Sequence, residues 1–231
     1  MQNQINYTSC TISSRQCKCF EKLTESELKL LNDNSVKIRY HKKEVICKQG
    51  ALVSHVLYVE DGLAKVFLDD GSNSLVLKLI PSGNFVGLAS ISDDFKTFQY
   101  SATTYVDSEI RQIDINVFKQ LVSQNSEFAK GIIDILSANS VQIYGRFFCL
   151  TNKQSYGRLA DILLCLADRI FQQPEFDLPL SRKELAELTG MSPETVMRIL
   201  KKFADEHLIK LTGKNFKVID YERLKRISET G

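Results

Sequence analysis

The sequence predicts an α+β protein with an N-terminal antiparallel β-roll of jelly-roll type, a long dimerisation helix and a C-terminal winged helix-turn-helix. Three observations support this fold class. Residues 36–115 contain about eight short β-rich runs separated by turn residues. Residues 126–150 carry an apolar repeat with helical spacing. The segment after Leu180 contains two short capped helices joined by a glycine turn, followed by a hairpin pattern.

The composition is that of a globular protein and excludes several other classes. The chain has 231 residues, of which 43% are hydrophobic and 25% charged. No run approaches the ~18 apolar residues of a membrane span, and the first twenty residues lack the apolar core of a secretory signal. We therefore expect a cytoplasmic protein without membrane association, and no disulfide framework among its six cysteines. The net charge is only +2, and the surplus lies after Asn152.

The first structural elements are predicted by a capping pattern and by turn residues. Residues 21–32 predict a short helix in which Thr24 and Glu27 form a capping box. Asp70-Gly71 marks a hairpin turn within the β-rich region. The expected strands are VKIRY, EVIC, HVLYV, LAKVFL, LVLKLI, FVGLASI, YSATTYV and EIRQID.

Residues 117–122 predict a short helix, and a longer one follows. In the longer helix, six positions spaced alternately three and four residues apart form one stripe: Ile133, Leu136, Ser140, Ile143, Phe147 and Leu150. Such a stripe is typical of the seam of a parallel homodimer. A core helix with two buried faces has the same spacing, so the spacing alone leaves both interpretations open.

After a polar break at residues 153–155, residues 156–171 predict another helix and residues 172–179 a loop. Ser181 and Glu184 then form a capping box that opens a short helix, and Gly190 ends it. Ser192 is the expected N-cap of the next helix, with Pro193 at its first position. LIKL and FKVI flank a basic turn and predict a β-hairpin wing. The alternative is an ordinary helical hairpin with solvated charges.

The second helix of this motif is predicted to enter the major groove of double-stranded DNA. Arg198 can donate two hydrogen bonds to guanine, and Glu194 can accept one from cytosine. Pro193 and Met197 lie on the same end of the helix, where Met197 can touch a thymine methyl group. The expected phosphate contacts are Ser181, Arg182, Lys183, Ser192, Thr195, Lys201 and Lys214. The alternative for Glu194 and Arg198 is an ion pair along one helix face.

No catalytic motif accompanies this pattern. The sequence has no phosphate-binding P-loop, no dinucleotide fingerprint and no H-E-x-x-H zinc motif. We therefore expect a protein that is not an enzyme. The alternative of a different class is a cyclic-nucleotide-type module that regulates an enzyme or channel, and such a module has no need of a winged helix.

The order of β-roll, long helix and winged helix resembles that of the Crp/Fnr superfamily of bacterial transcription regulators. The resemblance covers nearly the whole chain. EVICKQGALVSHVLYVEDGLAKVF and IPSGNFVG are similar to its cyclic-nucleotide-binding roll, with turns at Gly50, Gly62, Gly83 and Gly87. LSRKELAELTGMSPETVMRILKKF is similar to its helix-turn-helix, whose core stands here as Glu194, Thr195, Val196 and Arg198.

The resemblance implies four segments and three partners. The segments are an N-terminal tail (1–20), an effector-sensing β-roll domain (21–125), a dimerisation helix (126–152) and a winged helix-turn-helix DNA-binding domain (153–231). The partners are palindromic promoter DNA, a second copy of the chain, and RNA polymerase. The resemblance also favours the homodimer over the buried core helix.

The effector pocket departs from the pattern of the members that bind cyclic AMP. Its expected residues are Gly87, Leu88, Ala89, Ser90, Tyr100, Ser101 and Ala102. The glutamate that holds the ribose in those members is Leu88 here, and the arginine that pairs with the phosphate is Tyr100. Because a buried phosphate needs a paired cation, we predict no tight binding of cyclic AMP.

The effector itself stays open, and three alternatives follow. An iron–sulfur cluster on Cys10, Cys17 and Cys19 has the spacing C-x6-C-x-C, which is not the family's tighter spacing. Haem is a second alternative, through His41, His55 or a cysteine. The third, which we favour, is a small organic ligand in the roll or no ligand at all.

Overall fold

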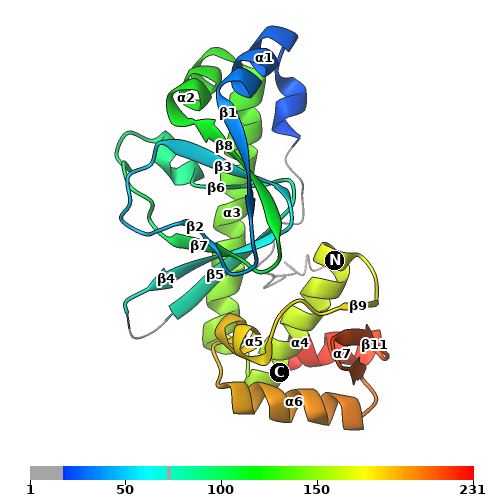
Figure 1. Cartoon of the computed structure of the whole chain (residues 1–231). Helices are drawn as coiled ribbons and strands as arrows, with labels where there is room; N and C mark the ends of the chain where they lie inside the picture. Colours follow the sequence, from blue (N-terminus) through cyan, green and yellow to red (C-terminus); the bar gives the residue numbers. More distant parts are fainter. Residues whose placement is uncertain (1–17, 72–73) are drawn as a thin grey trace, which may run out of the picture. The chain divides into compact units, whose positions relative to one another are not determined.

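The computed structural model describes residues 18–71 and 74–231, which form two compact units (Figure 1). The described part of the first unit runs from residue 18 to residue 140. The second unit contains residues 141–231. The long helix α3 (Ser126–Asn152) begins in the first unit and ends in the second.

The first unit is an antiparallel β-roll built from two four-stranded sheets. One sheet has the strand order β1-β8-β3-β6 and the other has the order β2-β7-β4-β5. The strands are β1 (Ser35–Tyr40), β2 (Val45–Cys47), β3 (His55–Asp61), β4 (Leu63–Asp69), β5 (Ser74–Pro81), β6 (Asn84–Val86), β7 (Ser101–Thr104) and β8 (Ser108–Asp114). These strands confirm the predicted antiparallel roll.

The turn between β3 and β4 shows why one of the expected turn glycines is needed. Gly62 has a φ of 111°, which is unfavourable for a residue with a side chain. A Cβ atom at this position would lie 2.1 Å from Ser108 Oγ on the neighbouring strand β8. Glycine therefore permits both the backbone turn and the close approach of the two strands.

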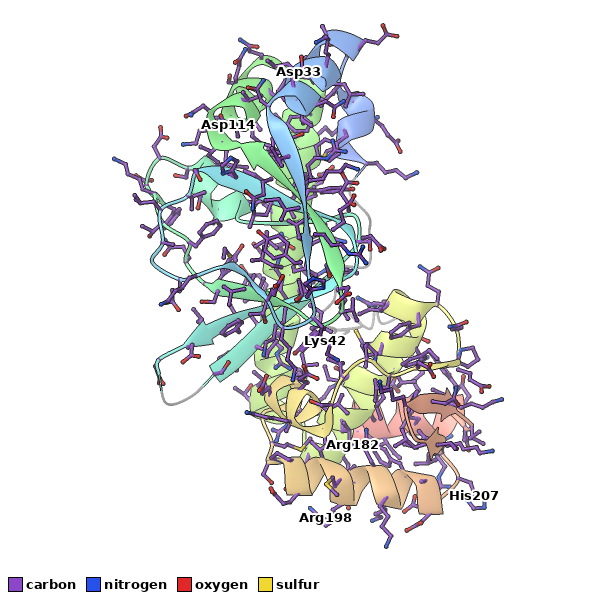
Figure 2. All side chains as sticks on the ribbon, viewed as in Figure 1. Asp33, Lys42, Asp114, Arg182, Arg198 and His207 are labelled. Atoms are coloured by element: carbon purple, nitrogen blue, oxygen red, sulfur yellow. The ribbon has the colours of Figure 1, made fainter. Side chains whose placement is uncertain are left out.

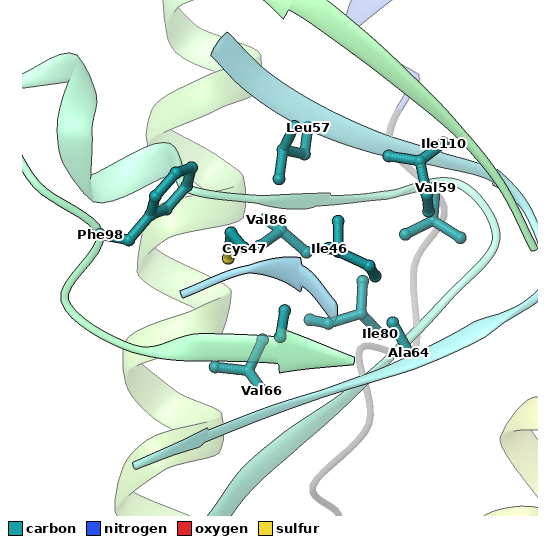
Figure 3. Packing of buried hydrophobic residues seen from close by; sticks show 11 residues of the cluster. Ile46, Cys47, Leu57, Val59, Ala64, Val66, Ile80, Val86, Phe98 and Ile110 are labelled. Atoms are coloured by element: carbon teal, nitrogen blue, oxygen red, sulfur yellow. The ribbon is translucent and has the colours of Figure 1, made fainter. Parts of the chain in front are cut away.

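The roll has a core on each side of the β1-β8-β3-β6 sheet. Leu57 and Val59 of β3 belong to a cluster that lies between the two sheets (Figure 3). Val56, which alternates with them, belongs to a second cluster on the other face. That cluster contains helix residues such as Leu31, Phe118 and Phe128. Strand β3 is thus buried on both faces of the sheet, which explains its nearly continuous apolar run.

The short helices of the first unit carry the predicted caps. Helix α1 (Glu25–Asp33) begins with the Thr24–Glu27 capping box. Helix α2 (Ile115–Gln124) contains the predicted 117–122 helix and is capped by Asp114. The run FVGLASI is not one strand, however. It divides into β6 and a 3₁₀-helix (Leu88–Ile91), because Gly87 between them has a φ of 89°.

The second unit is a winged helix-turn-helix domain. Its helices are α4 (Ser155–Cys165), a π-helical continuation of it (Leu166–Phe171), α5 (Arg182–Thr189), α6 (Pro193–Asp205) and α7 (Tyr221–Thr230). The predicted wing is the hairpin of β10 (Ile209–Thr212) and β11 (Asn215–Val218). A third strand, β9 (Glu175–Asp177), pairs with β11 in the segment that we expected to be a loop.

Within residues 18–71 and 74–231, no helix is long and apolar enough to cross a membrane.

Candidate nucleic-acid interface and effector pocket

The first helix of the helix-turn-helix is fixed by the capping box that the sequence predicts. The Glu184 N–H donates to Ser181 Oγ at 3.2 Å, and the Ser181 N–H donates to Glu184 Oε2 at 2.6 Å. Two of the unpaired N–H groups at the start of α5 are therefore satisfied. The carboxylate of Glu184 is buried by this arrangement.

The turn between α5 and α6 depends on Gly190. This residue has a φ of 61° and a ψ of 43°, the left-handed conformation that ends many helices. The next helix starts at once, because Ser192 Oγ accepts the N–H of Thr195 and Pro193 takes the first helical position. Helices α5 and α6 are thus held in a compact turn by residues that the sequence identifies.

Helix α6 has one buried and one exposed face. Its buried side chains are Val196, Ile199, Leu200 and Phe203. The opposite face carries Glu194, Met197, Arg198 and Lys201, and 58% of the Met197 surface is exposed. Figure 2 shows Arg198 on the outer side of α6. The residues proposed for base contacts therefore stand on an accessible helix face.

Glu194 and Arg198, which both belong to the described residues, do not form an ion pair with each other. Hydrogen bonds from the Glu194 N–H and the Ser192 hydroxyl hold the pKa of the Glu194 carboxyl below its usual value. Arg198 Nη1 instead donates to Tyr156 Oη at 3.5 Å. The carboxylate caps the helix start, and the guanidinium is supported by a residue of α4.

Tyr156 is a residue of this interface that the sequence did not identify. Its ring packs edge-on against the buried Phe203, with ring centroids 6.0 Å apart. The Lys202 ammonium lies 4.9 Å from the centre of the same ring. In the sequence, Tyr156 is marked only as an aromatic residue directly after the polar break at residues 153–155. That position gives no reason to expect contact with α6.

The basic residues of the domain fall into two groups. Lys217 pairs with Glu175 at 2.8 Å, and Lys202 lies 4.0 Å from Glu206. In the described part of the chain, the four cations among the expected phosphate contacts have no carboxylate within 4.0 Å: Arg182, Lys183, Lys201 and Lys214. Their charges are not neutralised by the protein, as phosphate contacts require.

The expected effector residues divide between the two cores of the roll. Tyr100 and Ala102 lie in or against the cluster between the sheets, with Gly87 beside them, because the Gly87 N–H donates to Tyr100 Oη at 3.0 Å. Burial raises the pKa of Tyr100 to about 12, so its phenol is neutral. Leu88 instead belongs to the cluster that contains Phe118 and Phe128.

The other expected pocket residues are Ser101, Ser90 and Ala89. Ser101 Oγ accepts the N–H of Gln49 at 3.0 Å. The Ser90 N–H donates to the Gly87 carbonyl, which closes the 3₁₀ turn, and Ser90 is buried whereas Ala89 is exposed. No cationic side chain belongs to the set of Gly87, Tyr100, Ser101 and Ala102. These residues do not fit a cyclic phosphate, because none of them supplies the paired charge.

The metal-binding alternatives have little support in the described residues. Cys10 and Cys17 lie outside them. Cys19 is buried and disulfide-bonded, and Cys165 is disulfide-bonded as well, which contradicts the expectation of no disulfide framework. His41 lies near Asp107, and His55 Nδ1 shares a hydrogen bond with Ser54 Oγ. In residues 18–71 and 74–231 no three His, Cys, Asp or Glu side chains form a group that could hold a metal ion.

The stripe expected to be a dimer seam is largely exposed. The exposed fractions are 61% for Ile133, 38% for Leu136, 50% for Ile143 and 70% for Phe147. Ser140 is also exposed, and its hydroxyl donates to the Leu136 carbonyl at 3.1 Å. Leu150 is half-buried, and its Cδ2 lies close to Gly190 in the turn. Within the described part of the chain, four large apolar side chains of this helix are thus exposed.

Comparisons with known proteins agree with both halves of this description. A Crp-like helix-turn-helix domain model matches residues 157–227, and a cyclic nucleotide-binding domain model matches residues 37–125. The cAMP-activated global transcriptional regulator CRP of Escherichia coli O6:H1 is 26% identical over 191 residues, which cover 78% of this chain and 88% of the relative.

Two further matches extend the comparison. The transcriptional activator protein anr of Pseudomonas aeruginosa is 26% identical over 185 residues, which cover 78% of this chain and 75% of the relative. The structure of FixK2 from Bradyrhizobium japonicum matches with a TM-score of 0.77 and 17% identity, and covers 85% of this chain and 98% of that chain. That structure shows the same fold.

Proposed function

We propose that this chain, which belongs to the Crp/Fnr family of DNA-binding transcription regulators, acts as a homodimer on two-fold symmetric promoter sites and does not respond to cyclic AMP. The observation that carries the proposal is the exposed face of α6, where Arg198 is supported by Tyr156 and is not neutralised by Glu194. Each copy presents one such helix to the major groove.

The base contacts follow from the order of residues on α6. Glu194, Met197 and Arg198 lie on the exposed face near the N-terminal end of the helix, which is the end that reads bases in this motif. Arg198 donates to guanine O6 and N7, while Glu194 accepts from cytosine N4. Pro193, Ser192 and Thr195 border this group at the start of the helix.

The phosphate contacts surround the recognition helix. Arg182 and Lys183 start α5, Lys201 lies one turn after Arg198, and Lys214 is at the tip of the wing. The hydroxyl of Ser181 stands beside them at the start of α5. These groups position the domain on the duplex without reading its sequence.

The exposed stripe on α3 supports the homodimer. Two copies of a helix with apolar residues at alternating spacings of three and four can pack along the seam and remove those side chains from water. Ser140 adds a polar position within the seam. A two-fold dimer then places its two recognition helices on successive turns of the duplex, and bound upstream of a promoter it can contact RNA polymerase.

The residues at the expected phosphate position support independence from cyclic AMP. The E. coli relative is cAMP-activated, but here the residue expected to pair with the phosphate is Tyr100, a neutral phenol. A buried charge left without its partner costs about 3–5 kcal/mol, which is enough to remove tight binding. A small organic ligand, or no ligand, fits this interior better.

Two measurements test the proposal. In a gel shift on genomic DNA fragments, we expect complexes that survive competitor DNA and form without cyclic AMP. A complete loss of the shift with competitor would favour a regulatory module of another class. Isothermal titration with cyclic AMP is expected to show no binding, and a low-micromolar affinity would overturn that part of the proposal.

A redox or gas sensor is the second candidate function, and Cys19, the described member of its expected cysteine set, is disulfide-bonded. An absorption spectrum of protein purified without oxygen tests it, with iron and acid-labile sulfide measured on the same sample. Broad absorption near 400 nm with stoichiometric sulfide, or a sharp Soret band, would replace the small-ligand interpretation. A colourless, iron-free protein that still shifts DNA would exclude the redox or gas sensor.

A further inference from the structure

A buried lysine in the β-roll has only an uncharged partner. Lys78 lies on β5 and is 9% exposed. Its Nζ donates to Asn139 Oδ1 of α3 at 3.0 Å. No carboxylate of the described residues lies within 4.0 Å of this ammonium.

The strand register places Lys78 on the inner face of its sheet. Val66 of β4 is directly opposite Lys78 on one side and opposite Ala102 of β7 on the other. Ala102 in turn is opposite Cys47 of β2. Directly paired residues share a face of a sheet, so the four side chains form one row across it. Figure 3 shows Cys47 and Val66 of this row within the cluster between the sheets.

The other side chains of this row and its neighbours carry no compensating negative charge. Burial raises the pKa of Cys47 to about 12, so its thiol is neutral. The phenol of Tyr100 is neutral for the same reason. Burial also lowers the pKa of Lys78 to about 8, which still leaves most of the ammonium charged at neutral pH. The interior of the roll therefore holds one cation and no anion among these groups.

An isolated buried charge is unfavourable, and a ligand that brings the opposite charge relieves it. An ammonium group has three N–H donors, of which Asn139 accepts one. Two donors remain for the oxygens of an anion. The surrounding side chains, Val66, Ala102 and Ile80, offer contacts only to an apolar body.

We propose that the β-roll binds a small organic acid with an apolar body, whose carboxylate accepts hydrogen bonds from Lys78 Nζ beside Asn139. This inference names the ligand class of the effector domain and rests on the proposed regulatory function. The polar end of the ligand lies where β5 meets α3. An effector here contacts the helix whose apolar stripe is assigned to the dimer seam.

A purely structural role for Lys78 predicts a different behaviour. If the lysine serves only to bind Asn139, its replacement by an uncharged side chain of similar length changes stability and nothing else. Replacement of a buried charge by methionine is often neutral or stabilising, so a folded Lys78→Met variant is expected. Ligand response therefore separates the two roles.

The experiment is calorimetric titration of the full-length protein with benzoate, and with benzamide as its uncharged analogue of the same shape. The wild type is expected to bind benzoate in the millimolar range or tighter and to bind benzamide at least about tenfold more weakly, the loss expected for a charge-assisted hydrogen bond. Lys78→Met should lose benzoate binding by a similar factor. Thermal unfolding with millimolar benzoate should show a matching shift for the wild type alone.

A second variant tests the same site without changing Lys78. Asn139→Asp supplies Lys78 with an internal carboxylate, so it should also lose benzoate binding while its unfolding temperature rises. Lys65→Met is the matched control, because Lys65 lies next to Val66 on β4 and points to the other face of the sheet. It should bind benzoate as the wild type does.

Equal affinity of the wild type for benzoate and benzamide, equal binding by Lys78→Met, or no benzoate binding by the wild type would each overturn the inference. These titrations use the protein alone. A separate gel shift in the absence of benzoate tests DNA binding. If the protein binds benzoate through Lys78 but gives no gel shift, the proposed function is contradicted and the ligand site is still supported.

Discussion

The helix-turn-helix and the interior of the β-roll treat their charged groups in opposite ways. On the helix-turn-helix, Arg182, Lys201 and Lys214 are accessible to solvent and have no carboxylate within 4.0 Å in the described part of the chain. In the roll, Lys78 is buried and its ammonium donates to Asn139. We propose that the first region binds a polyanion that remains in contact with water, and that the second binds a small ligand that is removed from water.

This difference shows how the two sites are specified. An exposed site on a capped helix can be predicted from the helix alone. Ser192 and Pro193 fix the start of α6, and the start of the helix determines where Arg198 lies on its exposed face. A buried site depends on which side chains from several strands meet. Lys78 and Asn139 are far apart in the sequence, and only the packing of α3 against the roll brings them together.

The largest expected effect is the loss of the dimer together with the loss of DNA binding. Ile143→Asp places a charge in the apolar stripe of α3, where two copies are proposed to pack. We expect loss of the dimer in sedimentation and loss of detectable specific DNA binding, because a single helix-turn-helix reads only half of the site. Val141→Asp is the control, since Val141 is 66% exposed but lies off the stripe. An intact Ile143→Asp dimer would refute the seam assignment.

The next effect sharpens the DNA-binding half of the comparison. Arg198→Ala should weaken binding to the preferred site by ~1–3 kcal/mol and relax the preference at one G·C pair. Quantitative gel shifts on the preferred site and on single-base variants measure both changes. A loss that is equal for every sequence would make Arg198 a phosphate contact.

A smaller effect tests whether free cations differ from paired ones. Lys214→Ala should weaken binding by a similar factor on all sequences and lower the slope of log affinity against log salt by about 1. Lys217→Ala should change the slope less, because Glu175 already neutralises Lys217. Equal slopes for the two variants would show that the wing tip does not contact phosphate.

The smallest expected effect comes from removing the hydrogen bond between Arg198 and Tyr156. Tyr156→Phe removes the hydroxyl that accepts the Arg198 hydrogen bond and keeps the ring packed on Phe203. We expect a loss of about 0.5–1.5 kcal/mol in affinity for the preferred site, and little loss in the Arg198→Ala background. Additive losses in the double variant would show that Tyr156 acts independently of Arg198.

Much of the fold follows from local patterns in the sequence. The capping boxes at Thr24 and Ser181, the start of α6 at Pro193 and the turn at Gly190 are all observed. Each depends on residues within about one helical turn of one another, where the side chain and the backbone group it caps are fixed by the same few residues.

Elements that depend on distant partners were not predicted. Strand β9 has three residues between two prolines, and it is a strand only because β11 pairs with it from Asn215 to Lys217. The contact of Tyr156 with Arg198 is missed for the same reason, since the two residues lie on different helices. Both result from packing, which the spacing of residues does not encode locally.

The central claim is that two copies of this chain read a symmetric DNA site without cyclic AMP. The most direct test is selection of bound sequences from randomised duplex DNA, carried out with and without cyclic AMP. The account predicts an inverted repeat whose half-site centres lie about one helical turn apart, enriched equally under both conditions. Enrichment of an isolated half-site, or enrichment that requires cyclic AMP, would contradict it.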